Sequence, residues 1–242
     1  MIYLCFLILY PMCLLGEESQ DEGRSKNFDF YSFNPLSLIP GSFPNNMVES
    51  IKLKTPDPYV KPKSFWVKEL ELSEKKYCGI KIESHEANHE FKSFNSQKDL
   101  LQQGFLITHK GACGTCSSVQ DLKVYLDRPN LTSPVRRCGA LSFKWPVIQC
   151  LRRLGFSEPC SETWYYNIVQ TRKKCARVCL QSWWKNEDFN QEDGALNACL
   201  ACDENESGPA FKVTAGRTRR RSGIQSAIKR MEHEFFRLSH EY

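Results

Sequence analysis

Ten cysteines between residues 78 and 202 constrain the fold of this chain more than any other feature of its sequence. Two further cysteines, Cys5 and Cys13, lie in an uncharged apolar stretch over residues 1–16. That stretch has the length and apolarity of a secretory signal peptide and is too short to span a bilayer comfortably; an uncleaved short anchor is the alternative. Signal removal leaves an even number of cysteines, which in an exported chain predicts disulfides, up to five of them. We therefore predict a secreted, extracellular protein with no membrane span after signal removal.

Composition divides the rest of the chain into two parts. Residues 17–63 are acidic at first, then rich in Asn, Ser and Pro, and they hold no cysteine and no sustained period. They are expected to form a poorly ordered leader. Residues 64–242 carry the ten cysteines and are expected to form one α+β domain, disulfide-rich and helix-rich with a small sheet, in which disulfides replace part of the core. Sequons at Asn130 and Asn205 predict N-glycosylation, which agrees with export.

Local patterns predict several elements of this domain. Residues 77–82 alternate like a strand. The capping box Ser96–Asp99 opens a short helix that closes at Gly104. Residues 145–154 read as another helix, with Gly155 as its C-cap.

A longer helix is expected from Glu162 towards Trp183, with Ser161 as its cap. Cys175 and Cys179 are four residues apart on it and therefore lie on one face. They are placed to join this helix to its neighbours, and they bond poorly to each other.

Residues 105–126 are predicted to form a short apolar strand, a glycine-punctuated loop and a helix that begins at Cys116 or Ser117. We call residues 111–117 the Cys loop. A helix N-terminus stabilises a thiolate, so this segment is a candidate thiol-based active site. Cys116 or Cys113 would be the nucleophile, with His109 as base and Asp121 orienting the imidazole. In the alternative reading both cysteines are bonded elsewhere and His109 satisfies a loop carbonyl.

Two known families share this loop pattern. Cys113-Gly-Thr-Cys116 resembles the redox loop of thioredoxin-like oxidoreductases, in which the first cysteine attacks and the second resolves. The stretch also resembles the Gly-X-Cys-Gly-X-Cys loop of the papain family, which implies Cys116 as nucleophile. Departures from both are present: no tryptophan precedes the motif, and Ser117 stands where the papain family has an aromatic residue. The substrate would be an anionic small molecule or a thiol/disulfide, and the sequence specifies no cofactor.

The segment His85-Glu-Ala-Asn-His89 is a formal H-E-x-x-H motif. On a helix it would place two imidazoles on one face for zinc, with Glu86 as general base. The third histidine that one zinc protease family needs is replaced by Asn95, so a metallohydrolase is the less favoured reading. A mixed zinc site of His89 and His109 with a cysteine is a further alternative.

Four arginines lie in the segment 216–223, which we call the arginine loop. A strand over 210–214 is expected before it, and after it a helix capped at Ser222 with Ile224 and Ile228 inside. Such a loop at a helix N-terminus can bind phosphate, sulfate or carboxylate. A proprotein-processing site and a basic turn paired with the acidic segment 202–204 are the alternatives. The anion-binding candidates are Arg217, Arg219 and Arg220.

A non-catalytic function is the second class that we consider. The arginine loop would then dock an acidic partner such as a sulfated glycan. The formal net charge of +5 is modest and does not by itself imply nucleic acid. The oligomeric state cannot be read from the sequence.

The Cys loop and the arginine loop together resemble segments of a group of exported, cysteine-rich eukaryotic proteins. The shared patterns are His-X-Gly-X-Cys-Gly-X-Cys-Ser-Ser-X-Gln-Asp-Leu and Ala-Gly-Arg-Thr-Arg-Arg-X-Ser-Gly. This resemblance implies a fold unit over about residues 78–230 and no activity. Because both loops lead from a strand to a helix N-terminus in this reading, we hypothesise that His109, Cys116 and one of the three candidate arginines line a single cleft.

Overall fold

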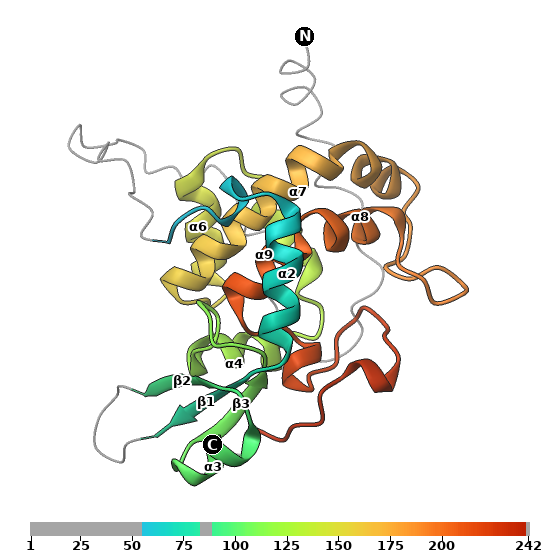
Figure 1. The fold of residues 1–242 in the computed structure, drawn as a ribbon. Coiled ribbons are helices and arrows are strands. Elements are labelled where there is room, and N and C mark those ends of the chain that lie inside the picture. Colours follow the sequence, from blue (N-terminus) through green and yellow to red (C-terminus); the bar gives the residue numbers. More distant parts are fainter. Residues whose placement is uncertain (1–54, 83–88, 241–242) are drawn as a thin grey trace, which may run out of the picture. The chain divides into compact units, whose positions relative to one another are not determined.

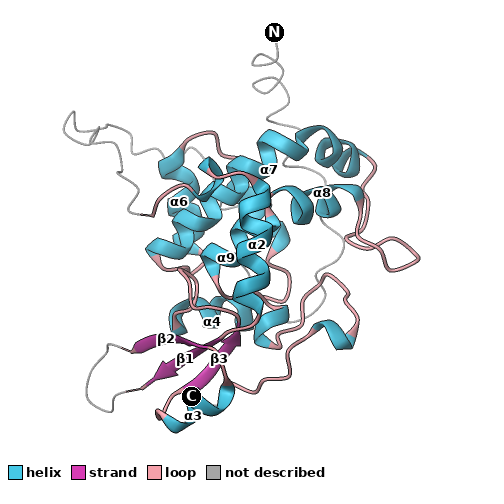
Figure 2. Cartoon of the chain, viewed as in Figure 1, coloured by secondary structure: helices cyan, strands magenta, loops and turns pink. Residues whose placement is uncertain are grey.

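A computed structural model describes residues 55–82 and 89–240. It confirms the predicted class: a helix-rich α+β unit with one small antiparallel sheet and five disulfides. The sheet lies at one end, and most of the helices form a separate layer beside it (Figures 1 and 2). The predicted signal peptide and residues 17–54 of the predicted leader lie outside the described residues.

The sheet has strand order β2-β1-β3, formed by β1 (Tyr77–Lys81), β2 (Glu90–Phe94) and β3 (Leu106–Lys110). Both pairings are antiparallel, and a bulge interrupts the β1–β3 register between Cys78 and Gly79. The helix α3 (Gln97–Gln102) joins β2 to β3, and Ser96 caps it as predicted, accepting from the Asp99 amide at 3.1 Å. The predicted strand over 77–82 is thereby confirmed as β1.

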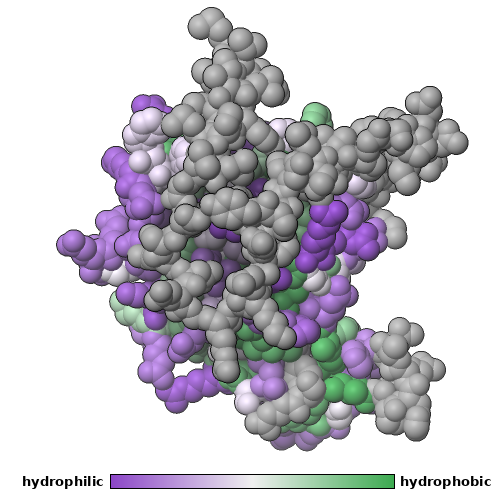
Figure 3. Space-filling model, turned by 180° about the vertical axis from the view of Figure 1, so that it is seen from behind, coloured by the Kyte–Doolittle hydropathy of each residue, from purple (hydrophilic) through white to green (hydrophobic). Residues whose placement is uncertain are grey.

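A small apolar cluster of Phe94, Leu100 and Phe105 packs between the sheet and α3. Gly79 leaves room for this cluster, because a Cβ atom on it would lie 3.0 Å from an atom of each of these three side chains. The outer surface at this end also exposes apolar side chains (Figure 3), namely Ile82, Leu101 and Leu106.

The longest helix, α7 (Glu158–Trp184), organises the helical layer. Packed against it are α5 (Thr132–Gly139), α6 (Lys144–Arg153), α8 (Ala198–Glu206) and α9 (Gly208–Ala215). The main core lies between these helices and α4 (Val119–Asp127) and includes Leu122, Val147, Leu151 and Phe156. The predicted helices over 145–154 and 162–183 are confirmed as α6 and α7, although Ser157, four residues before Ser161, caps α7.

Five disulfides join the elements. Cys175 and Cys179 bond to Cys202 and Cys199 of α8, which confirms that these two cysteines reach a neighbouring helix and not each other. The other three bridges are Cys78–Cys113, Cys116–Cys160 and Cys138–Cys150.

Two predicted elements near the C-terminus are wrong. Residues 210–214 are not a strand: they belong to α9, which begins with Pro209 in its first turn. The arginine loop itself contains a single 3-10 turn, η5 (Arg220–Ser222), and the predicted helix capped at Ser222 is absent from the described residues after it. A second 3-10 turn, η6 (Glu232–Glu234), follows. The run over 210–214 is too short for its apolar pattern to separate a strand from a buried helix.

The folded unit also begins before Ser64. The 3-10 turn η4 (Pro58–Val60) precedes α2 (Lys63–Glu74), and both pack against α9. The Thr55 amide donates to the Glu162 carboxylate, and the Tyr59 hydroxyl lies 3.0 Å from acceptors on Asn167 and Ser207.

Candidate functional site

The Cys loop and the arginine loop lie together, and Arg217 joins them. His109, Cys116 and Arg217 are completely buried, so they pack against each other and do not line an open cleft. The Arg217 guanidinium donates to three backbone carbonyls: Cys116 at 3.1 Å, Thr108 at 3.0 Å and Ser117 at 2.9 Å. It also donates to the hydroxyl of Ser222 at 3.2 Å. The guanidinium of Arg217 therefore binds groups inside the protein, and its hydrogen bonds hold the Cys loop in place.

His109 lies in the same cluster and is also completely buried. Its Nδ1 lies 3.0 Å from the Lys110 carbonyl, which can only accept, so Nδ1 carries the proton. Nε2 therefore accepts from the Ser117 hydroxyl, 2.8 Å away, and the Ser117 oxygen accepts from the Gly114 amide. Burial lowers the pKa of His109 well below its usual range, and the Arg217 guanidinium lowers it further. The ring is neutral and is bonded to the loop, with no cysteine as its partner.

Cys113 and Cys116 are each bonded to a distant cysteine, Cys78 and Cys160 respectively. In this structure neither residue is a thiol, and the two are not joined to each other. Asp121 does not orient His109: its carboxylate accepts from the Ser118 hydroxyl and from the amide and hydroxyl of Ser157. Burial raises the pKa of the Asp121 carboxyl, although these hydrogen bonds oppose that shift. The arrangement supports the alternative reading, in which the Cys loop is structural.

The other arginines of the arginine loop also have internal partners. Arg219 donates to the carbonyls of Tyr125 and Gln225, at 2.7 and 3.0 Å. Arg220 pairs with Glu234 at 2.8 Å and with Glu204 at 3.5 Å. The pair between Arg220 and Glu204 agrees with one of the alternatives from the sequence, a basic turn paired with the acidic segment 202–204. Within the described residues, the hydrogen bonds and ion pairs given above for Arg217, Arg219 and Arg220 all end on groups of the same chain.

Only the last residue of the H-E-x-x-H motif, His89, belongs to the described residues. His85 and Glu86 lie outside the described residues, and His89 directly precedes β2 in non-helical backbone. Within residues 55–82 and 89–240, no three His, Cys, Asp or Glu side chains are grouped to hold a metal ion.

The two sequons lie in different settings. Asn130 precedes α5 and its side chain is bonded to the backbone and hydroxyl of Ser133. Asn205 is exposed in the last turn of α8. Glycosylation at both stays a prediction.

The charge distribution along the chain shows a basic region that our sequence interpretation missed. Residues 128–185 contain eleven Lys and Arg against only Glu158 and Glu162, a net charge of +9, so the rest of the chain sums to −4. Glu162 is buried and accepts from the Thr55 amide. The total charge of +5 does not show this local excess of positive charge. A count of charged residues in a window moved along the sequence would have found it.

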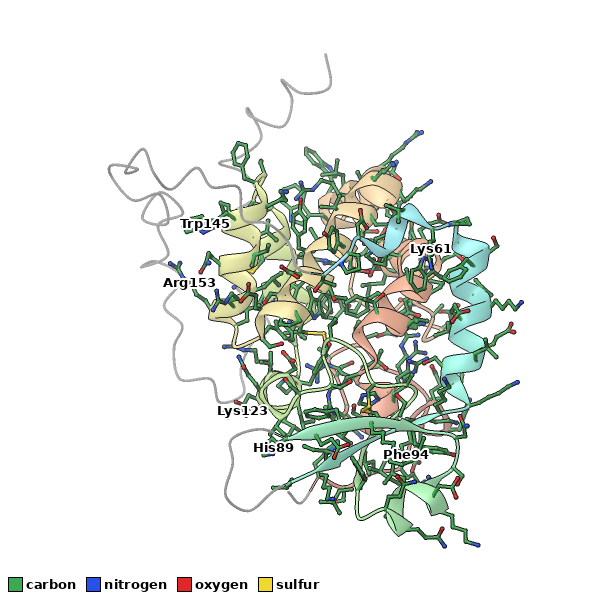
Figure 4. All side chains as sticks on the ribbon, turned by 60° about the vertical axis from the view of Figure 1, so that its left-hand side comes forward. Lys61, His89, Phe94, Lys123, Trp145 and Arg153 are labelled. Carbon is green, nitrogen blue, oxygen red and sulfur yellow. A yellow bond between two sulfur atoms is a disulfide. The ribbon has the colours of Figure 1, made fainter. Side chains whose placement is uncertain are left out.

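One outward side of α6 combines basic and aromatic side chains, and we call it the α6 face: Trp145, Gln149, Arg152 and Arg153. Trp145 and Arg153 project from the same side of α6 (Figure 4). Arg152 and Arg153 are exposed, and within the described part of the chain neither forms an ion pair with an acidic side chain. Trp145 is 37% exposed.

Two residues next to the α6 face add a further aromatic and a further basic side chain to this surface. Phe143, just before α6, is 76% exposed, and Lys144 is exposed beside it. An exposed surface that joins guanidinium groups to aromatic rings, with no acidic side chain in α6, can hold an anionic group next to an apolar ring face.

Across the part of the chain that the structure describes, no helix is both long and apolar enough to cross a membrane.

Comparison with known proteins gives one match. Residues 145–238 match the model of a family of unknown function (DUF8771). The match begins at α6 and includes the arginine loop and six of the ten cysteines, whereas the sheet and the Cys loop lie before it. No curated protein and no solved structure matches the chain. Residues 145–238 are thus similar to a family of unknown function, and in this chain they carry six cysteines.

Proposed function

We propose that this protein is a secreted, non-catalytic binding protein whose α6 face binds an acidic polysaccharide, such as a sulfated glycan. The observation that carries the proposal is the group of exposed basic residues on α6, Lys144, Arg152 and Arg153, beside Trp145. They lie within the segment 128–185, whose net charge is +9. Five disulfides support an oxidising, exported environment for the protein.

The chemistry of the α6 face suits this ligand class. A guanidinium presents a planar fork of N–H donors that matches the oxygen atoms of a sulfate or carboxylate. Trp145 and Arg152 are seven residues apart, about 10 Å along the helix and on one side of it. A single oligosaccharide lying along α6 can thus place a sugar ring on Trp145 and an anionic group on Arg152.

Immobilised heparin tests the proposal. We expect retention to a salt concentration higher than that needed on a sulfonate cation exchanger, because the glycan contacts both the arginines and the ring. The double variant Arg152→Gln, Arg153→Gln should bind heparin about tenfold more weakly, given the strength of hydrogen bonds to charged groups. Trp145→Ala should lower retention on heparin and leave retention on the cation exchanger unchanged.

Lys75→Gln with Lys98→Gln is the matched control, because it removes the same charge from exposed positions on α3 and at the end of α2. The control should bind heparin like the natural chain. Equal losses in the two double variants would show an attraction governed by net charge alone, and the proposed α6 site would then be rejected.

A further inference from the structure

One face of α7 carries an exposed stripe of apolar and basic side chains, which we call the α7 stripe: Val169, Lys173, Arg177, Leu180 and Trp184. At 100° per residue these five positions fall within an arc of about 80°. Trp184 is 78% exposed, Leu180 is 49% exposed and Val169 is 39% exposed. A tryptophan so open to solvent, in line with two other apolar side chains, is typical of an interaction surface.

An acidic segment follows the stripe directly. Residues 187–193, which we call the acidic loop, contain Glu187, Asp188, Glu192 and Asp193, all exposed. Together with Asn197 and Ala198, side chains of this loop line a hollow of about 390 Å³. The end of α7 and the acidic loop lie at one outer edge of the helical layer (Figure 1).

We propose that the α7 stripe pairs with the α7 stripe of a second copy of this chain, in an antiparallel twofold dimer centred on Leu180. A twofold interface must be complementary to itself. Along α7 the order is basic, apolar, acidic: Lys173 and Arg177 precede Leu180, and the acidic loop follows Trp184. Reversing one copy about Leu180 therefore places each acidic loop beside the basic turn of the other copy.

The register of this pairing specifies two contacts. Position 184 lies four residues after the centre and position 177 three residues before it, so Trp184 meets Arg177 of the second copy in a cation–π contact. Lys173 lies seven residues before the centre, and Glu187 lies in the acidic loop just after the end of α7, so we expect these two residues to form an ion pair between copies. Within one chain Glu187 pairs with Lys185 at 3.8 Å, an exposed contact that contributes little and can be exchanged.

The charge pattern favours a second copy over other occupants. A polyanion or an anionic lipid surface would be attracted to Lys173 and Arg177 and repelled by the adjacent acidic loop. A dimer formed by one helix face and one loop lies at the low end of interface sizes, so it is expected to be weak and concentration-dependent. The inference does not rest on glycan binding, because the α6 face takes no part in it.

Analytical ultracentrifugation of the secreted chain tests the dimer between about 1 μM and about 1 mM, where weak interfaces dissociate. We expect a monomer–dimer equilibrium. Leu180→Glu should raise the dissociation constant at least about tenfold, as for a central interface residue. Leu126→Glu is the matched control, because Leu126 on α4 is 48% exposed, as Leu180 is, and it should leave the equilibrium unchanged.

Charge reversal supplies an independent test. Lys173→Glu with Arg177→Glu should weaken the dimer, and so should Glu187→Lys with Asp188→Lys. The four changes combined should restore association, because the attraction is then reversed in sign on both sides. A monomer at every concentration, an equal effect of Leu126→Glu, or no restoration in the combined variant would each overturn the proposal. These positions are exposed, and circular dichroism verifies that each variant is folded.

Discussion

Arg217 is the residue on which the meeting of the two loops depends. A guanidinium does not lose its proton in a protein, so a buried one must have its donors satisfied. Here the carbonyls of Thr108, Cys116 and Ser117 accept most of the hydrogen bonds that the guanidinium donates. The residue type that predicts anion binding on a surface therefore acts as a structural crosslink, and it adds to the effect of burial in lowering the pKa of His109.

This environment makes the stability of the protein depend on pH through His109. Its pKa in the folded protein lies below the ordinary value of about 6.5. As the pH falls below that value, the unfolded chain takes up a proton that the folded chain does not, so the free energy of unfolding decreases. Urea unfolding at several pH values between about 7 and 5 measures the slope to which His109 makes this contribution.

His109→Gln should reduce the slope by up to about 1.4 kcal/mol per pH unit, the value for one proton. In this variant part of the dependence of the free energy of unfolding on pH should remain, because burial lowers the pKa of His240 too. The exposed His233 supplies the control, and His233→Gln should keep the slope of the natural chain. An unchanged slope in His109→Gln would contradict this account of the buried imidazole.

At the scale of elements, the end of α9 and the Cys loop are joined through their backbones. The amides of Thr115 and Cys116 donate to the carbonyls of Thr214 and Ala215, each at 2.9 Å. These carbonyls belong to the last turn of α9, where no amide of the same helix is available to them. The Cys loop therefore supplies hydrogen-bond donors to the last carbonyls of α9. These hydrogen bonds require the backbone of the Cys loop to lie close to the backbone at the end of α9.

Gly216 permits that approach, and its substitution should be costly. Its φ is +72°, and a Cβ atom on it would lie 2.5 Å from the Gly114 nitrogen. We expect Gly216→Ala to lower the free energy of unfolding by about 3 kcal/mol or more, the sum of a left-handed backbone and an overpacked contact. Chemical unfolding with the disulfides intact measures this value.

Gly194 provides the matched comparison. Its φ is +84°, but nothing lies within 4 Å of its Cβ position. Gly194→Ala should therefore cost only the backbone term of about 1–2 kcal/mol. Similar losses in the two variants would mean that the close contact at Gly216 is unimportant.

At the scale of the whole molecule, the disulfides link layers that are far apart in the sequence. Cys78–Cys113 ties β1 to the Cys loop, and Cys116–Cys160 ties that loop to α7. Their sequence separations are 35 and 44 residues. Closing such loops restricts the unfolded chain and stabilises the folded one.

Non-reducing peptide mapping of the secreted protein should recover these two bridges as separate linked peptides. Thiol titration of the unfolded, unreduced protein should find no free thiol among the ten cysteines after residue 16, because all ten are paired. A peptide with Cys113 bonded to Cys116, or a reactive thiol at either position, would instead favour the thiol-based active site.

The sequence by itself determined what depends on counting and on local pattern. An even cysteine count in an apolar-led chain predicted the disulfide framework, the capping box at Ser96 predicted α3, and the four-residue spacing of Cys175 and Cys179 predicted bridges to another element. Only the tertiary structure decided which cysteines pair, that residues 210–214 are helical, and that Arg217 faces inward. Those outcomes depend on contacts across about a hundred residues, such as that between Arg217 and Cys116, and no local period records such contacts.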